Sequence, residues 1–221
     1  MLCNATAEKD WQAVVELALT RQEILPFLGI HPWWAETATS GWDKRLRSLL
    51  VQTAAGVGEI GLDKCCRADF GQQQLLFETQ LQMAVELSRP IVIHCVKAWG
   101  RIVAMLEQLT RPLPPIMIHA FSGSEDILQR LLRLGCFISF SARLDNDHKM
   151  HHCLLATPLT NLLLESDAPG KPNNQTVFSA EPAAIIQLYR LVATLKETPL
   201  DEFRQEIWNN GEIFTHTILP R

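Results

Sequence analysis

The chain has 221 residues, 47% of them hydrophobic, which is enough for one sizeable core. Its formal net charge of -4 and pI near 6.0 argue against a protein that holds nucleic acid by overall basicity. Six cysteines show no zinc-ribbon or redox spacing, and neither a signal peptide nor an apolar run near the ~20 residues of a membrane span is recognisable. We therefore expect a single reduced, cytoplasmic domain over residues 1–221, with no membrane association.

Short apolar runs, which predict strands, alternate with amphipathic stretches, which predict helices, through the first half of the chain. Thr6 is a typical helix-capping residue, and the acidic Glu8 and Asp10 suit a first helical turn. A loop is expected at Pro32-Trp33-Trp34. The expected strands are 1–4, 25–30 and 54–63, and the expected helices are 7–21, 43–52 and 70–88.

The same alternation continues to the end of the chain. Ser122-Gly-Ser-Glu125 fits a capping box, with Ser122 as the cap, and Gly135 predicts the end of the helix that follows. The expected strands are 90–94, 115–119, 136–140 and 162–167, and the other expected helices are 98–109, part of 147–156, 181–196 and 199–209.

Strands separated by helices predict parallel pairing through right-handed crossovers, and hence a TIM-type (β/α) barrel. A closed barrel of this type has eight strands, whereas seven strand positions are found here. The first of them begins almost at Met1. We therefore expect that the first βα unit is missing and that Met1 is an internal methionine of a longer ancestral frame.

Metal-type ligands stand at or just past the ends of these apolar runs. Glu59 lies between two glycines at the end of a buried run, and the runs that follow end in His94, His119 and Asp167. His31 ends an earlier run. A buried carboxylate is costly unless it is paired or bound to a metal. One such residue is equally well explained by a salt bridge, but the repetition predicts convergence at the mouth of a barrel.

Five motifs carry a family resemblance: Gly29-Ile-His31-Pro-Trp, Gly58-Glu59-Ile-Gly-Leu-Asp63, Pro90-Ile-Val-Ile-His94-Cys, Ile118-His119-Ala-Phe-Ser-Gly123-Ser and Leu164-Glu165-Ser-Asp167-Ala-Pro169. In order and spacing the chain resembles the TatD-type metal-dependent deoxyribonucleases, which are amidohydrolase-like barrels. The closing Asn209-Asn210-Gly-Glu-Ile-Phe214 is similar to the carboxyl-terminal segment of that family.

The resemblance implies a two-metal hydrolase that cleaves phosphodiester bonds of DNA. Glu59 matches the bridging carboxylate, and His94 and His119 match the imidazoles that complete one metal shell. Asp167 matches the carboxylate that ligates the other ion and orients the attacking water, so the expected catalytic residues are Asp167 and Glu59. Imidazole and carboxylate suit zinc, with magnesium or manganese as alternatives.

Three further residues are expected to bind the substrate. His31 matches a position near the substrate and is assigned to phosphate contact rather than to a metal. Lys97 and Arg101 are expected to contact the phosphate, because the usual arginine of the family is Val96 here. Trp33 and Trp34 suit either stacking on a base or packing of their loop.

The chain departs from the family pattern in one respect, and this leaves alternative functions open. Family members begin with a His-x-His pair on the first strand, and this chain has none. It is therefore either a DNase of exonuclease type that holds one ion better than two, or a catalytically impaired barrel scaffold. A hydrolase of small phosphorylated or amide substrates is a further alternative, because the fold does not choose among these reactions.

Overall fold

The computed structural model describes residues 1–110, 112–141, 144, 148–169 and 181–218. The chain divides into two compact units. Met1–Met117 and Phe214–Arg221 form the first unit, and Ile118–Ile213 form the second unit.

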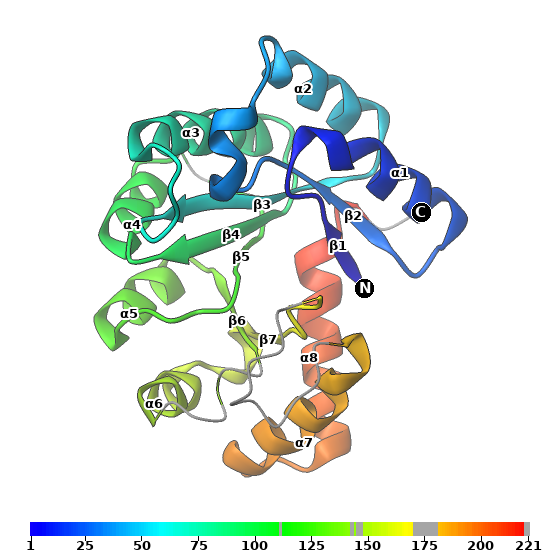
Figure 1. Cartoon of the computed structure of the whole chain (residues 1–221). Helices are drawn as coiled ribbons and strands as arrows, with labels where there is room; N and C mark the ends of the chain where they lie inside the picture. The colour runs from blue at the N-terminus through cyan, green and yellow to red at the C-terminus, as the bar shows by residue number, and fades with distance from the viewer. Residues whose placement is uncertain (111, 142–143, 145–147, 170–180, 219–221) are drawn as a thin grey trace. The chain divides into compact units, whose positions relative to one another are not determined.

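Seven strands belong to one sheet and follow one another in chain order (Figure 1). The pairs β1–β2, β2–β3, β3–β4 and β6–β7 are all parallel. Within the residues that the structure describes, the predicted βα alternation and the seven strands are therefore confirmed. The strands are β1 (Leu2–Asn4), β2 (Leu25–Leu28), β3 (Gly56–Asp63), β4 (Ile91–Val96), β5 (Ile116–Ile118), β6 (Phe137–Phe140) and β7 (Leu162–Leu164).

Helices follow the strands as the sequence pattern predicts. Short 3-10 segments lie at Glu8–Asp10, Pro32–Thr37, Leu159–Asn161 and Pro182–Ala184, and the second of these replaces the expected loop. The α-helices are α1 (Trp11–Thr20), α2 (Trp42–Gln52), α3 (Phe70–Glu86), α4 (Trp99–Glu107), α5 (Glu125–Arg133), α6 (His148–Ala156), α7 (Ile185–Leu195) and α8 (Leu200–Thr215).

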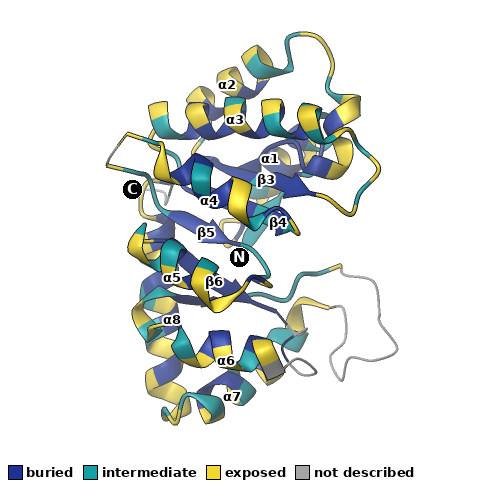
Figure 2. Ribbon diagram, turned by 90° about the vertical axis from the view of Figure 1, so that its left-hand side faces the viewer, coloured by how far each residue is buried: buried dark blue, intermediate teal, exposed yellow. Residues whose placement is uncertain are grey.

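The core of the first unit is built on β3 and β4. Apart from Glu59, every residue of β3 is buried, as the dark blue strands of Figure 2 show. The carboxyl-terminal Phe214 stacks on Phe27 of β2, with the ring centroids 5.8 Å apart. A strand buried on both faces is expected to carry mainly apolar or small residues, so its two carboxylates, Glu59 and Asp63, need partners.

Two predicted helix caps were wrong in detail. The Thr6 hydroxyl donates to Asp10 Oδ2, which itself accepts the Ala7 N–H, and the cap position of the first helical segment is Ala7. Ser124, not Ser122, caps α5, because its hydroxyl accepts the Ile127 N–H at 3.4 Å. The Ser-x-x-Glu motif fits only Ser122, because Glu125 lies three residues after it, but α5 begins at Glu125 itself, which makes Ser124 the cap.

Helix α8 extends six residues beyond its predicted end at residue 209. The buried Asn210 side chain donates to the carbonyls of Leu159 and Leu162, at 2.7 and 2.9 Å. Asparagine is normally unfavourable inside a helix. The local pattern therefore predicted that the helix ends early. The helix continues because the tertiary hydrogen bonds of Asn210 offset the local preference.

Two buried glutamines of α3 hold the carboxyl ends of β2 and β3. Gln80 accepts the Ile30 N–H at 2.6 Å and donates to the Ile30 carbonyl at 3.3 Å. Gln73 accepts the Asp63 N–H at 2.8 Å and donates to the Asp63 carbonyl at 3.1 Å. Backbone groups at the ends of buried strands need partners, and α3 supplies them.

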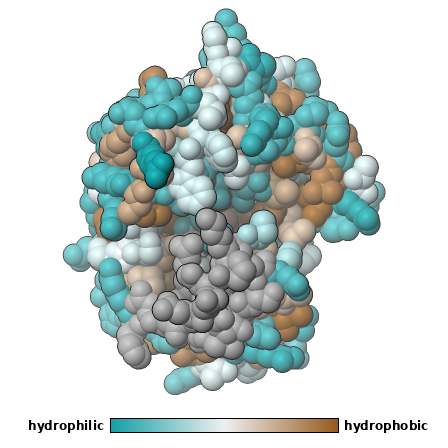
Figure 3. Space-filling model, in the orientation of Figure 1, coloured by the Kyte–Doolittle hydropathy of each residue, from teal (hydrophilic) through white to brown (hydrophobic). Residues whose placement is uncertain are grey.

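Hydrophilic and hydrophobic residues lie side by side on the face drawn in Figure 3. Exposed apolar side chains include Leu19 and Trp33 of the first unit, which are 80% and 60% exposed. In the described parts of the chain, no helix is both long enough and apolar enough to cross a membrane.

Substituting Gln80→Leu should lower the free energy of unfolding by roughly 2–4 kcal/mol, because the N–H and C=O of Ile30 would be buried without partners. Urea unfolding measures the effect. Gln82→Leu on the exposed face of the same helix is the control, expected to change stability by about 0.5 kcal/mol or less. Equal effects of the two substitutions would contradict the role assigned to Gln80.

Candidate metal centre

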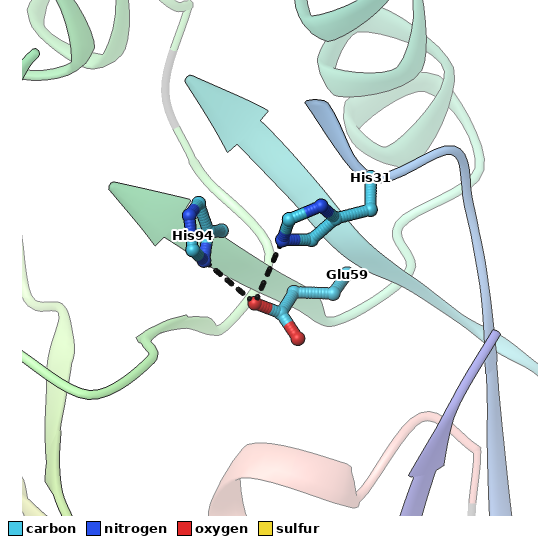
Figure 4. A group of neighbouring side chains, drawn as sticks. All are labelled: His31, Glu59 and His94. Carbon is cyan, nitrogen blue, oxygen red and sulfur yellow. Dashed lines mark hydrogen bonds and ion pairs between the residues drawn. The ribbon is translucent and has the colours of Figure 1, made fainter. Parts of the chain in front are cut away.

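Three predicted site residues of the first unit form one cluster. His31, Glu59 and His94 each offer a ligand atom, and these atoms all lie within 4.8 Å of one another. Both imidazole rings face the Glu59 carboxylate (Figure 4). Glu59 Oε1 lies 3.0 Å from His94 Nδ1 and 3.6 Å from His31 Nε2.

The backbone brings these groups together at the strand ends. The register of β3 shifts between Val57 and Ile60, next to Glu59. Gly61 pairs with His94, and a Cβ on Gly61 would lie 1.9 Å from the His94 carbonyl oxygen. Only glycine allows the two strands to approach this closely.

His94 lies between two carboxylates. Its Nδ1 faces Glu59, and its Nε2 is 3.4 Å from Asp63 Oδ2. A neutral imidazole carries one proton and therefore cannot donate to both carboxylates. Either the arrangement carries a second proton, on the ring or on Glu59, or a cation takes the place of that proton. The arrangement therefore fits a bound cation, with Asp63 orienting the ring from behind.

Asp63 is fixed by several donors at once. Its Oδ2 accepts the Trp33 indole N–H at 2.6 Å, and its Oδ1 accepts the Cys65 N–H at 2.7 Å. Burial opposes ionisation, but hydrogen bonding with His94, Trp33 and Cys65 outweighs it and lowers the pKa of Asp63 well below its usual range. Asp63 is therefore a carboxylate at any physiological pH.

His31 is held differently. Its Nδ1 accepts the Trp33 backbone N–H at 3.2 Å, as the cap of the 3-10 segment Pro32–Thr37. An accepting Nδ1 carries no proton, so the proton of a neutral ring lies on Nε2. Nε2–H faces Glu59. This tautomer makes His31 a hydrogen-bond donor and disfavours a metal bond through Nε2.

The second unit contains a similar arrangement around His119. His119 Nδ1 lies 2.8 Å from Glu165 Oε2, and Nε2 lies 3.5 Å from Asp167 Oδ1. The other oxygen of Glu165 accepts the Ala120 N–H at 2.7 Å. Glu165 thus orients the ring, and the opposite nitrogen faces Asp167.

The donor sets suit a divalent cation. Two ligand atoms that each lie about 2.1 Å from one ion are roughly 3.0–3.4 Å apart. The separations of Glu59 from His94 and of His119 from Asp167 are 3.0 and 3.5 Å. Both pairs therefore require little movement to hold an ion.

Backbone strain accompanies the strand ends. Lys97, Ala120 and Asp167 have φ values of 53°, 40° and 54°. A left-handed conformation costs a residue other than glycine about 1–2 kcal/mol, so the surrounding contacts must support it. The hydrogen bond from Ala120 to Glu165 is one such contact.

The predicted ligands thus form two pairs, Glu59 with His94 in the first unit and His119 with Asp167 in the second. That all four surround one centre stays a prediction. Lys97 follows β4 directly and Arg101 lies in the first turn of α4; both are exposed.

Sequence analysis assigned no role to Asp63 or Glu165, although both stand in the motifs quoted above. Each lies an even number of residues from a predicted ligand, Asp63 four after Glu59 and Glu165 two before Asp167. Side chains two residues apart on an extended chain share one face. That spacing was the signal that could have identified them.

Two cysteines of the first unit are held as thiols. Burial raises the pKa of the Cys66 thiol, and it raises that of Cys95 to about 12. Among the described residues, the potential ligands that lie together are the imidazoles of His31 and His94 and the carboxylate of Glu59.

A parallel βα fold that carries imidazoles and carboxylates at its strand ends defines the class of barrel-type metal-dependent hydrolases. A family comparison makes the assignment specific. The model of the TatD related DNase family matches residues 1–215, and the chain belongs to this family.

Individual relatives agree with this assignment. The chain is 31% identical over 219 residues to the uncharacterized metal-dependent hydrolase YjjV of Escherichia coli K12, covering 95% of this chain and 83% of the relative. The crystal structure of YjjV matches with a TM-score of 0.88 at 28% identity, over 96% of this chain and 85% of that one. The predicted TIM-type fold is thereby confirmed.

A nuclease is also similar to this chain. The 3′-5′ ssDNA/RNA exonuclease TatD of Edwardsiella piscicida is 33% identical over 149 residues, covering 64% of this chain. The match spans 56% of the length of that exonuclease.

Replacing Asp63→Asn should weaken zinc binding by about 10–100-fold, because an amide orients the His94 ring less firmly and does not raise its basicity. Competition with a chromophoric chelator measures the affinity. Glu86→Gln, which removes an exposed ion pair with Arg47, is the control. Unchanged affinity in a folded D63N variant would show that Asp63 does not support the metal.

Proposed function

We propose that this chain is a divalent-metal-dependent phosphodiesterase that removes nucleotides from the end of single-stranded DNA or RNA. The observation that carries the proposal is the position of His94 between Glu59 and Asp63, an arrangement that needs a cation or a second proton. The similarity to the 3′-5′ ssDNA/RNA exonuclease of Edwardsiella piscicida supports the choice of substrate.

Glu59 and His94 would hold one ion, and His119 and Asp167 would contribute to the same or a second ion. Zinc is the proposed metal, because a mixed imidazole and carboxylate set at these separations suits it. When bound, it supplies Lewis acidity at the phosphoryl oxygen and lowers the pKa of water.

Asp167 is the proposed base. Its carboxylate faces His119 at 3.5 Å, and its side chain is 33% exposed, more open than the other candidate ligands. That exposure lets a water molecule approach it. Asp167 would orient this water and accept its proton as the oxygen attacks phosphorus.

Three residues of the first unit would bind the phosphate. Nε2–H of His31 can donate to a phosphate oxygen, in keeping with its tautomer. Lys97 and Arg101 add positive charge beyond the end of β4, and no ion pair with a carboxylate is found for either within the described ranges. They are therefore available to an anionic substrate.

The direct test is to digest single-stranded oligonucleotides labelled at the 3′ or the 5′ end, with zinc, magnesium, manganese or a chelator present. Loss of the 3′ label as a mononucleotide only when metal is present is the expected result. Stable DNA binding without cleavage under any metal condition would favour the scaffold. Cleavage restricted to small phosphate monoesters or amides would favour the other alternative.

The double substitution His94→Ala with His119→Ala should abolish both metal binding and cleavage, because it removes an imidazole from each pair. Elemental analysis after dialysis measures the metal. His152→Ala, which changes an exposed histidine, is the control. Undiminished zinc in the double variant would refute the ligand assignment.

His31→Ala provides a separate test. We expect it to retain most of the bound metal but to raise the KM for an oligonucleotide about 10-fold or more, because a charge-assisted hydrogen bond to phosphate is lost. A parallel loss of metal would show that His31 is a ligand instead. His31→Gln, which keeps an N–H donor, should recover part of the lost affinity.

A further inference from the structure

Trp33 lies directly beside the candidate metal centre of the first unit. Its ring centroid is 4.8 Å from that of His31 and 6.3 Å from that of His94, with the ring planes steeply inclined in both pairs. It is nevertheless 60% exposed. A large aromatic surface is thus open to solvent next to the proposed phosphate contact.

The indole is fixed in this exposed position. Its N–H donates to the buried Asp63 carboxylate at 2.6 Å, and its backbone N–H donates to His31. A side chain already held by hydrogen bonds loses little further freedom when a ligand binds.

The neighbouring Trp34 provides a contrast. The Lys9 ammonium lies over its ring, 4.7 Å from the centroid, and Trp34 is 37% exposed. Trp34 thus already has a cationic partner on its ring. The two adjacent tryptophans therefore differ in what they present to solvent, although sequence analysis could not distinguish them.

We propose that Trp33 is a stacking platform for one nucleobase of the single-stranded substrate, and that it binds the nucleotide next to the phosphate held at His31. The inference rests on the proposed function. Stacking suits it because every base has an aromatic face, so an aromatic side chain can bind an end of any sequence. Substrates that lack a base at that position would bind more weakly.

The effect can be isolated by comparing matched oligonucleotides, one with all bases present and others with a single abasic residue at each of the last three 3′ positions. The measured quantity is the largest ratio of abasic to normal KM. From the usual strength of base stacking on an aromatic side chain, we expect a ratio of about 5–100 for the unmodified chain. Trp33→Leu should reduce this ratio to about one.

Two further variants separate stacking from the contact with Asp63. Trp33→Phe keeps an aromatic face but loses the N–H donor, so it should retain a ratio well above one even if kcat or metal affinity falls. Trp34→Leu should keep the full ratio. If Trp33→Leu keeps the ratio of the unmodified chain, the platform is refuted and Trp33 serves only to hold Asp63.

Failure of the proposed function can be distinguished from failure of the platform. Fluorescence anisotropy of the same labelled oligonucleotides measures binding without requiring cleavage. A chain that does not cleave but still binds the normal strand more tightly than the abasic one, through Trp33, would refute the nuclease proposal and support the platform. Equal binding of both strands would overturn the platform whatever the activity.

Discussion

The site of the first unit depends on the way α3 completes the hydrogen bonding of the strand ends. Ile30 and Asp63 lie where β2 and β3 end, and their backbone groups are satisfied by Gln80 and Gln73. His31 follows Ile30 directly. Because one rigid helix holds both strand ends, the imidazole and the carboxylate that supports His94 are positioned together. A site built this way needs little reorganisation when a ligand binds.

The two histidine centres follow the same design. His94 has Glu59 at one nitrogen and Asp63 at the other, and His119 has Asp167 and Glu165. In each case one carboxylate can share a cation with the ring, and the second fixes its orientation. The charges of the carboxylates exceed what one neutral imidazole can satisfy, so each centre favours a bound cation.

The net charge of -4 means that any polyanion must be held by local features. Lys97 and Arg101 supply positive charge near the end of β4, and Trp33 supplies an aromatic face beside His31. Attraction to phosphate weakens with added salt, whereas stacking is much less sensitive to it. A site that combines the two can bind single strands without relying on overall basicity.

The sequence by itself predicted the alternation of strands and helices, the family, and Glu59, His94, His119 and Asp167 as candidate ligands, because strand-end placement follows from local apolar runs. It did not predict the roles of Asp63, Glu165, Gln73 and Gln80, and it took Ser122 instead of Ser124 as the cap of α5. Those roles depend on contacts between residues far apart in the chain, such as Gln80 with Ile30 at a separation of 50 residues. Local patterns report which face a side chain takes, and only the tertiary structure decides which hydrogen-bond partner it meets there.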